Sequence, residues 1–287
     1  MRDSESPDFS VKDAPASAAA GFLLAADDPR PAVVENPAAA SDFVLVCDHA
    51  GRATPRSLGR LGLPPTAFDL HIAWDLGALA LARRLSQELD AVLVHQSYSR
   101  LVIDCNRAPG HAGAIVASSD GVDIPGNCGL SLQDRSTRVA EIHAPYHRAI
   151  AAAMDRVAAG GRQPQLVCVH SFTPVMQGLT RPWSVGVLHG PRSPASEVLL
   201  ALLGGDAAFV VGDNEPYAMD GIDFTAPHHA WSRGLDVLEI EVRQDLLASP
   251  ALVEAMAERL HTPIASAWAK VRTGSSCVLQ SGREPEP

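Results

Sequence analysis

The sequence lacks several features that would place it in common classes of protein. No apolar run approaches the length that a membrane-spanning helix needs. The N-terminal stretch MRDSESPDFSVKDAP is acidic and polar, without the basic and apolar regions of a signal peptide. The formal net charge is -10 at pH 7, whereas nucleic acids and anionic membranes require a basic surface. We therefore expect a cytoplasmic protein whose partner is neither a nucleic acid nor a membrane.

Cysteine is scarce, and its spacing offers no metal or disulfide motif. The chain has five cysteines, an odd number, and no CxxC pair. Three of them, Cys47, Cys105 and Cys168, lie within apolar runs that resemble strands. This pattern is typical of reduced thiols that pack in a core.

Two frequent catalytic signatures are also missing. The loop after the first predicted strand reads CDHAGRATP, with one glycine, and the sequence has neither a GxGxxG nor a GxxxxGK[ST] loop. A Rossmann or P-loop nucleotide site needs such glycines to bring the backbone close to phosphate. The GxSxG elbow of serine hydrolases is absent as well. These absences argue against nucleotide binding and serine-based hydrolysis.

What the sequence does contain is an alternation of short apolar runs and helical patterns. Runs rich in β-branched residues predict strands at 43–47, 91–95, 166–170, 184–188, 208–212 and 236–242. Most of them are apolar on both faces, as in a sheet that helices cover on each side. Apolar residues at helical spacing predict helices within 75–90, 133–158 and 250–272, the last with Ser249 as its N-cap and Pro250 at its first position.

This alternation predicts an α/β fold with three α/β/α layers around a mixed, largely parallel sheet. We expect one domain over residues 41–274. Residues 1–40 are rich in Ala, Pro, Asp and Ser without a sustained period, which is typical of a flexible arm. We expect residues 275–287 to form a loose tail.

Polar residues stand near the ends of the predicted strands, where sheets of this type bind ligands. His49 follows the first strand, and His170 ends the third. Glu239 and Glu241 are two residues apart and therefore share one face of the last strand. Each has an ordinary structural explanation when taken alone. Together with the arginine-containing segment SRLVIDCNR at 99–107, they are the parts of a zinc hydrolase.

Seven segments in order resemble the N-formylglutamate amidohydrolase family over residues 42–248. They read VCDHAGRATP, HIAWDLGALALARRL, SRLVIDCNR, VHSFTP, VGVLHGPR, VGDNEPY and LEIEVRQDL. The resemblance implies a phosphorylase/hydrolase-like α/β fold, akin to zinc carboxypeptidases and aspartoacylase. It also implies a zinc-dependent amidohydrolase that cleaves an N-acyl amide on an acidic amino acid, typically N-formyl-L-glutamate, in histidine breakdown.

The resemblance carries over to particular residues. His49 resembles the first zinc histidine and His170 the second. Glu241 resembles the catalytic glutamate that takes a proton from water. Asn106 and Arg107 resemble the turn that holds a substrate carboxylate.

The third metal ligand departs from the wider superfamily. Zinc carboxypeptidases have a glutamate three positions after the first histidine, where this sequence has Arg52. Asp75 is the first choice, because a carboxylate there would open the helix that follows the first strand, and His71 is the second. Alternatively, Asp75 caps that helix and favours its dipole.

Further candidates each have two readings. Arg100 either polarises the scissile carbonyl or pairs with Asp104. Asn214, in the sequence DNEPY, either offers its amide to the substrate or belongs to a turn. Arg243 either binds a second carboxylate or pairs with Glu241.

His229, or its neighbour His228, either contacts the substrate or lies in a solvated loop. Two other functions stay open. The substrate is another N-acyl amino acid or a small peptide, or the chain is a metal-free binding protein on a hydrolase fold.

Overall fold

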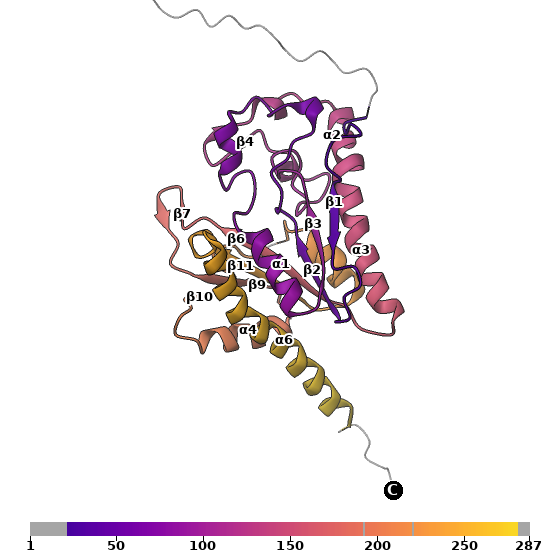
Figure 1. The fold of residues 1–287 in the computed structure, drawn as a ribbon, viewed down its shortest axis with the longest axis vertical. Helices are drawn as coiled ribbons and strands as arrows, with labels where there is room; N and C mark the ends of the chain where they lie inside the picture. The colour runs from indigo at the N-terminus through magenta and orange to yellow at the C-terminus, as the bar shows by residue number, and fades with distance from the viewer. Residues whose placement is uncertain (1–21, 192, 220, 281–287) are drawn as a thin grey trace, which may run out of the picture.

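Seven strands form the central sheet of the structure, a computed structural model that describes residues 22–280 apart from 192 and 220 (Figure 1). Across the sheet they are ordered β1 (Ala32–Glu35), β3 (Val92–Gln96), β2 (Phe43–Cys47), β6 (Gln165–Phe172), β11 (Val237–Arg243), β9 (Val185–Leu188) and β10 (Val211–Asp213). Strands β3, β2, β6 and β11 run parallel. Strands β1 and β9 each run antiparallel to their inner neighbours, β3 and β11. The sheet is therefore mixed and largely parallel.

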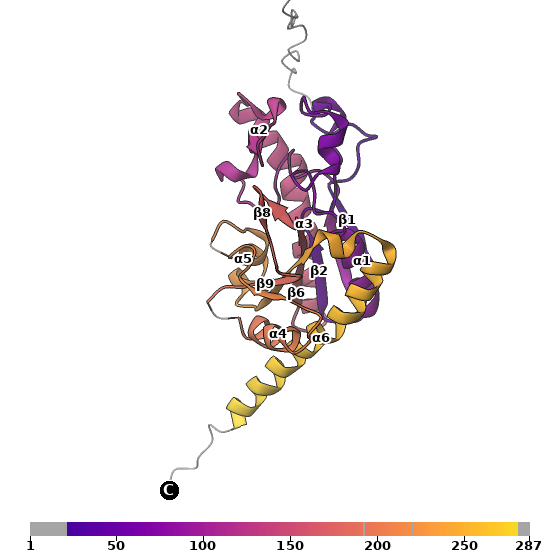
Figure 2. The ribbon, with the colours of Figure 1, turned by 90° about the vertical axis from the view of Figure 1, so that its left-hand side faces the viewer.

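Helices cover both faces of this sheet. On one face, α1 (Ala78–Glu88), α4 (Pro194–Gly204) and α6 (Pro250–Gln280) pack with one core cluster. On the other face, α3 (Ala144–Ala159) and the short α5 (Thr225–His229) pack with the second cluster (Figures 1 and 2). Every residue of β2 and β6 is buried, as expected for strands that lie between two helical layers. The predicted three-layer α/β/α fold is confirmed.

Most elements lie where the sequence pattern predicted them. The helical pattern at 133–158 is divided into α2 (Leu132–Arg138), a π-helical turn at Val139–His143, and α3. Ser249 accepts a hydrogen bond from the backbone of Leu252, so it caps α6 as predicted. Helix α4 was not predicted. Among the described helices, none combines the length and the apolarity that crossing a bilayer requires.

The two ends of the chain differ from the expected boundaries. Residues 32–35, expected in the flexible arm, form β1, because their backbone pairs with the edge of β3. At the other end the backbone stays helical to Gln280, beyond the expected boundary at residue 274. Residues 1–21 and 281–287 lie outside the described part of the chain.

Loops beyond the carboxyl ends of β2 and β3 bring distant segments together. The loop after β2 crosses the loop after β3, where the backbone of Ala53 donates to the carbonyl of Ser97 at 3.2 Å. At Gly51 the two backbones are so close that a Cβ atom would lie 2.0 Å from the Ser97 oxygen. This crossing holds His49 beside the segment 99–107.

Candidate metal centre and active site

A cavity of about 390 Å³ opens at the carboxyl ends of the central strands. The loop after β2 contributes His49 to its lining, β6 contributes His170, and β11 contributes Glu239 and Glu241. Sheet register fixes one pair of cavity residues, and a backbone hydrogen bond fixes another. Glu241 lies opposite His170 in the β11–β6 ladder, and the Asp75 amide donates to the His49 carbonyl at 2.9 Å. The strand ends thus deliver the predicted residues to one cavity.

His49, Asp75 and His170 form a buried cluster whose ligand atoms all lie within 4.8 Å of one another. Oδ2 of Asp75 is 2.9 Å from Nδ1 of His170 and 3.4 Å from Nδ1 of His49. The two imidazole centroids are 5.1 Å apart. Two imidazoles and one carboxylate are the donor set of catalytic metal sites that keep one position open. These residues could therefore hold a metal ion.

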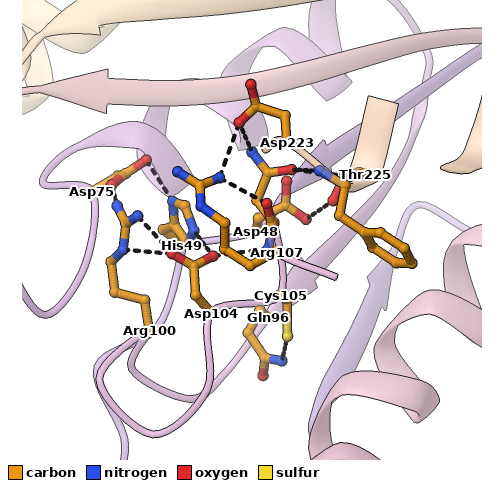
Figure 3. Close-up of polar contacts among 12 residues, drawn as sticks. Asp48, His49, Asp75, Gln96, Arg100, Asp104, Cys105, Arg107, Asp223 and Thr225 are labelled. Carbon is orange, nitrogen blue, oxygen red and sulfur yellow. Dashed lines mark hydrogen bonds and ion pairs between the residues drawn. The ribbon is translucent and has the colours of Figure 1, made fainter. Parts of the chain in front are cut away.

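Each imidazole has a second carboxylate at its far nitrogen. Nε2 of His49 is 2.7 Å from Oδ1 of Asp104, a hydrogen bond that Figure 3 shows. Nε2 of His170 is 3.3 Å from Oδ2 of Asp48, an ion pair without hydrogen-bond geometry. Carboxylates in this place fix the imidazole tautomer and raise the basicity of a metal ligand. The outer partners thus fit a metal centre as well as the inner three residues do.

The carboxylates around the two imidazoles favour a positive charge at the centre of the cluster. Burial would raise the pKa of Asp75, but the His49 and His170 imidazoles outweigh it and lower this pKa. Burial would lower the pKa of His170, but Asp48 and Asp75 raise it well above its ordinary value. The pKa of His49 is also raised, because Asp104 and Asp75 outweigh burial. The carboxylates therefore favour protons on these rings or, in their place, a cation.

Asp75 does not cap α1, which was the alternative reading of this residue. The N-cap position of that helix is Gly77, and no side chain caps it. His71, the second choice for the third ligand, lines the cavity but pairs with Asp120 at 3.1 Å. Among the described residues, the metal-type cluster contains Asp75 and not His71.

Two buried glutamates stand beside the cluster. Glu239 and Glu241 are 2% and 6% exposed, and Oε2 of each has no hydrogen-bond partner among the described residues. Burial raises the pKa of Glu241 to about 7 and that of Glu239 to about 8. A carboxylate with a pKa near neutrality can both accept and return a proton.

The arginine-containing segment also lines the cavity, next to the cluster. Arg100 donates to Oδ2 of Asp104 at 2.6 and 3.1 Å and lies 3.6 Å from Asp75 (Figure 3). It therefore makes the structural pair with Asp104 while also facing the cavity. Arg107 also lines the cavity and pairs with Asp223 at 3.0 Å.

Asn106 joins this segment to the chain before α5. Its Oδ1 accepts from the backbone of Phe224 and Thr225 at 3.0 and 2.9 Å, and its amide donates to Asp223 at 3.1 Å. Asn106 lines the cavity, but these bonds already use its polar atoms.

Three predicted substrate-binding residues do not line the cavity. Oδ1 of Asn214 accepts from the backbone of His189 at 2.9 Å. The guanidinium of Arg243 turns to Asp245 at 2.7 Å. His229 is buried against His147, with 2.9 Å between Nε2 of His229 and Nδ1 of His147.

A set of buried histidines behind the cavity was not recognised from the sequence. Nε2 of His147 is 2.9 Å from the carbonyl of Cys105, and Nε2 of His143 is 3.0 Å from that of Arg107. Burial lowers the pKa of His147 to about 4 and that of His229 to about 3, so both rings stay neutral. A neutral His147 that donates to Cys105 must accept from His229 at its other nitrogen. These rings hold the backbone that carries Asn106 and Arg107.

Asp48, Asp104 and Asp223 contact residues of the site, but they were not among the site residues predicted from the sequence. Asp48 directly precedes His49, and Asp104 lies two positions before Asn106. Their closeness in sequence to these predicted residues was the signal that could have identified them. Asp223 is 116 positions from Arg107, and no local pattern links the two.

Comparisons with known proteins give the family and the fold. The family model for N-formylglutamate amidohydrolase matches residues 41–248. A gene product of Agrobacterium tumefaciens of known crystal structure is 38% identical, with a TM-score of 0.84 over 87% of this chain and 99% of its own. The N-formylglutamate amidohydrolase of Ralstonia eutropha JMP134 is 18% identical, with a TM-score of 0.58 over 82% of this chain and 99% of its own, and so shares the fold. No curated protein matches the sequence. Because the family model covers most of the chain, this protein belongs to the N-formylglutamate amidohydrolase family.

Proposed function

We propose that this protein is a zinc-dependent amidohydrolase that removes an N-formyl group from an amino acid. N-formyl-L-glutamate is the reference substrate, because the family is named for it. The buried cluster of His49, Asp75 and His170 carries the proposal, since its donors match those of catalytic zinc sites. A zinc ion held by these three residues would supply a Lewis acid and a water of lowered pKa.

Glu241 is the general base and then the general acid in this proposal. It lines the cavity beside His170, its partner on the adjacent strand, and burial raises its pKa to about 7. It accepts a proton from the attacking water and delivers it to the nitrogen of the leaving amine. A group with a pKa near the working pH suits both transfers.

Arg100 and Arg107, which line the same cavity, orient the substrate. Arg100 faces the cavity beside Asp75, so it can donate to the oxygen of the scissile amide, where negative charge develops. Arg107 binds the α-carboxylate of the substrate, so that its guanidinium donates both to this group and to Asp223, its present partner. Asn106 holds the backbone segment that carries Asp223, because its side chain bonds to Asp223, Phe224 and Thr225. A role in histidine breakdown stays a prediction that follows from the family, and a cytoplasmic location stays a prediction from the sequence.

The test replaces the proposed base without changing its shape. Glu241→Gln should retain the metal and lose turnover of N-formyl-L-glutamate or a related N-formyl amino acid by on the order of 10²-fold or more. Glu88→Gln, on the outer surface of α1, is the matched control and should behave as the wild type. Turnover of Glu241→Gln within a few fold of the control would remove Glu241 from the reaction.

A further inference from the structure

A third guanidinium group stands at the edge of the cavity, behind residues that line it. Nη1 of Arg181 donates to the hydroxyl of Tyr217 at 2.9 Å, and the guanidinium carbon lies 4.7 Å from the centre of the Tyr217 ring. The same carbon lies 5.8 Å from the centre of the Phe172 ring, and Nη2 donates to the sulfur of Met176. Tyr217, Phe172 and Met176 all line the cavity. These contacts place the positive charge of Arg181 directly behind this part of the lining.

Among the residues that the structure describes, Arg181 has no acidic partner, unlike the two arginines that line the cavity. Arg100 and Arg107 each form an ion pair with an aspartate. The guanidinium of Arg181 instead bonds to a hydroxyl, to a thioether sulfur and, at 3.5 Å, to the carbonyl of Thr173. None of these partners carries a formal charge. An anionic group on a ligand would therefore meet a guanidinium that no carboxylate already neutralises.

Tyr217 presents a second donor at the same place. Its hydroxyl accepts from Arg181, so its own proton stays available for donation to a ligand. Burial and then the negative charge of Glu241 raise the pKa of Tyr217, although Arg181 opposes them, so the hydroxyl keeps this proton near neutral pH. Tyr217 and Arg181 thus combine an O–H donor and a positive charge, the groups that a carboxylate requires.

The backbone that carries Arg181 is fixed from two sides. The Arg181 amide donates to the carbonyl of Pro174 at 2.9 Å, at the base of the hairpin 175–180. Nη1 of Arg243 lies 3.3 Å from the Arg181 carbonyl and donates to it. Arg243, which was considered for a second substrate carboxylate, therefore supports the segment from which Arg181 projects. A binding group on a fixed backbone loses little freedom when a ligand arrives.

N-formyl-L-glutamate, the reference substrate, presents two carboxylates. In the proposed reaction Arg107 binds the α-carboxylate, and Arg100 donates to the oxygen of the scissile amide. The side-chain carboxylate then needs another cation, and Arg181 supplies one without a competing acidic partner in the described part of the chain.

We propose that Arg181 and the hydroxyl of Tyr217 form the subsite for the side-chain carboxylate of the substrate. Arg181 is then the residue that selects an N-acyl amino acid with an acidic side chain over one with a neutral side chain. This inference rests on the proposed deacylation at the same site.

The experiment compares N-formyl-L-glutamate with N-formyl-L-glutamine, which has nearly the same shape and no side-chain charge. The zinc-loaded wild type should show a kcat/KM for the glutamate compound at least about tenfold above that for the glutamine compound, because hydrogen bonds to charged groups are stronger than neutral ones. Arg181→Gln should reduce this ratio to about threefold or less. Arg181→Lys keeps the charge and should retain more of the preference than Arg181→Gln.

Arg259 provides the matched control. Its guanidinium carbon also lies near an aromatic ring, 6.0 Å from the centre of Phe209, and it does not line the cavity. Arg259→Gln should keep the wild-type ratio. Tyr217→Phe tests the hydroxyl and should lower kcat/KM for the glutamate compound about three- to tenfold, the effect of one lost hydrogen bond. An unchanged value would overturn the part of the proposal that concerns Tyr217.

Two kinetic results would overturn the role of Arg181. One is a wild type that cleaves the glutamate and glutamine compounds equally well. The other is an Arg181→Gln variant that loses activity on both compounds to the same extent and so keeps the wild-type ratio. That result would limit Arg181 to supporting the hairpin and the Tyr217 ring.

Binding separates this inference from the proposed function. If the zinc-loaded protein cleaves neither compound, the proposed function fails, and calorimetry with the same two compounds still decides the subsite. Tighter binding of the glutamate compound, with the difference lost in Arg181→Gln, supports the subsite. Equal binding of the two compounds, or binding of neither, overturns it.

Discussion

Asp104 offers the sharpest test of how the metal centre is built, and Asp104→Asn is the perturbation. In the wild type, Oδ1 of Asp104 lies 2.7 Å from Nε2 of His49 and accepts from the backbone of Asn106 at 2.9 Å, while Oδ2 accepts from Arg100 at 2.6 Å. Asparagine replaces one of the two acceptor oxygens with an NH₂ donor. This donor therefore faces another donor, either the N–H of His49 or the guanidinium of Arg100.

The expected cost follows from the role of such carboxylates. Loss of an outer partner of a metal-bound histidine lowers metal affinity about 10- to 100-fold. This corresponds to about 1.4 to 2.7 kcal/mol of binding free energy. The zinc dissociation constant of Asp104→Asn, measured in competition with a chromophoric chelator, should rise by that factor, and circular dichroism should show an unchanged fold.

A second aspartate–histidine pair provides the matched control. Asp213 lies 2.7 Å from Nε2 of His189, the same separation as in the Asp104–His49 pair. Its side chain is 68% exposed, and neither residue lines the cavity. Asp213→Asn should leave zinc affinity unchanged. Zinc affinity of Asp104→Asn within about twofold of this control would refute the outer-partner role, since such partners contribute tenfold or more.

Two further predictions concern the framework around the site. Burial lowers the pKa of His229 from 6.5 to about 3, so between these values the unfolded chain gains a proton that the folded chain does not, and stability falls as pH falls. His229→Gln should reduce the pH dependence of the free energy of unfolding of the metal-free protein by up to about 1.4 kcal/mol per pH unit between pH 6 and pH 4. The free energy is measured by denaturant titration at each pH, and an unchanged dependence on pH would contradict this. Gly51→Ala places a Cβ atom 2.0 Å from the Ser97 oxygen and should lower the free energy of unfolding by about 1–3 kcal/mol or more. Gly110→Ala meets no atom within 4 Å and is its control; equal denaturation midpoints would show that the loop crossing tolerates a side chain.

The fold was predictable because it depends on local periodicity. The run FVLVC at 43–47 is apolar on both faces, and the structure buries all five residues within β2. Strand β1 was not predictable in the same way. Its four residues, AVVE, follow a segment rich in Ala, Pro and Asp, and only the edge of β3 makes them a strand. Helix α4 has a uniformly apolar segment, LLALLG, which lacks a clear helical period.

The site was predictable where a residue stands at a strand end. His49 and His170 do so, and the structure brings both to Asp75. Arg243 pairs with neither of the partners considered for it. It stands at the last position of β11, where its guanidinium turns to Asp245.

Partners that meet only through the tertiary fold could not be read from spacing. Asp223 reaches Arg107 across 116 positions, and His147 reaches His229 across 82. Asn214 is drawn away from the cavity by the backbone of His189, a contact that the turn sequence DNEPY does not encode.

The central claim is that His49 and His170 bind the same metal ion together with Asp75. The most direct measurement is the metal content, by inductively coupled plasma mass spectrometry, of wild type, His49→Ala and His170→Ala, each purified without added metal. We expect zinc near one ion per chain in the wild type and a large loss in each variant, with Asp213→Asn retaining the wild-type content. Full zinc occupancy in both alanine variants would contradict it.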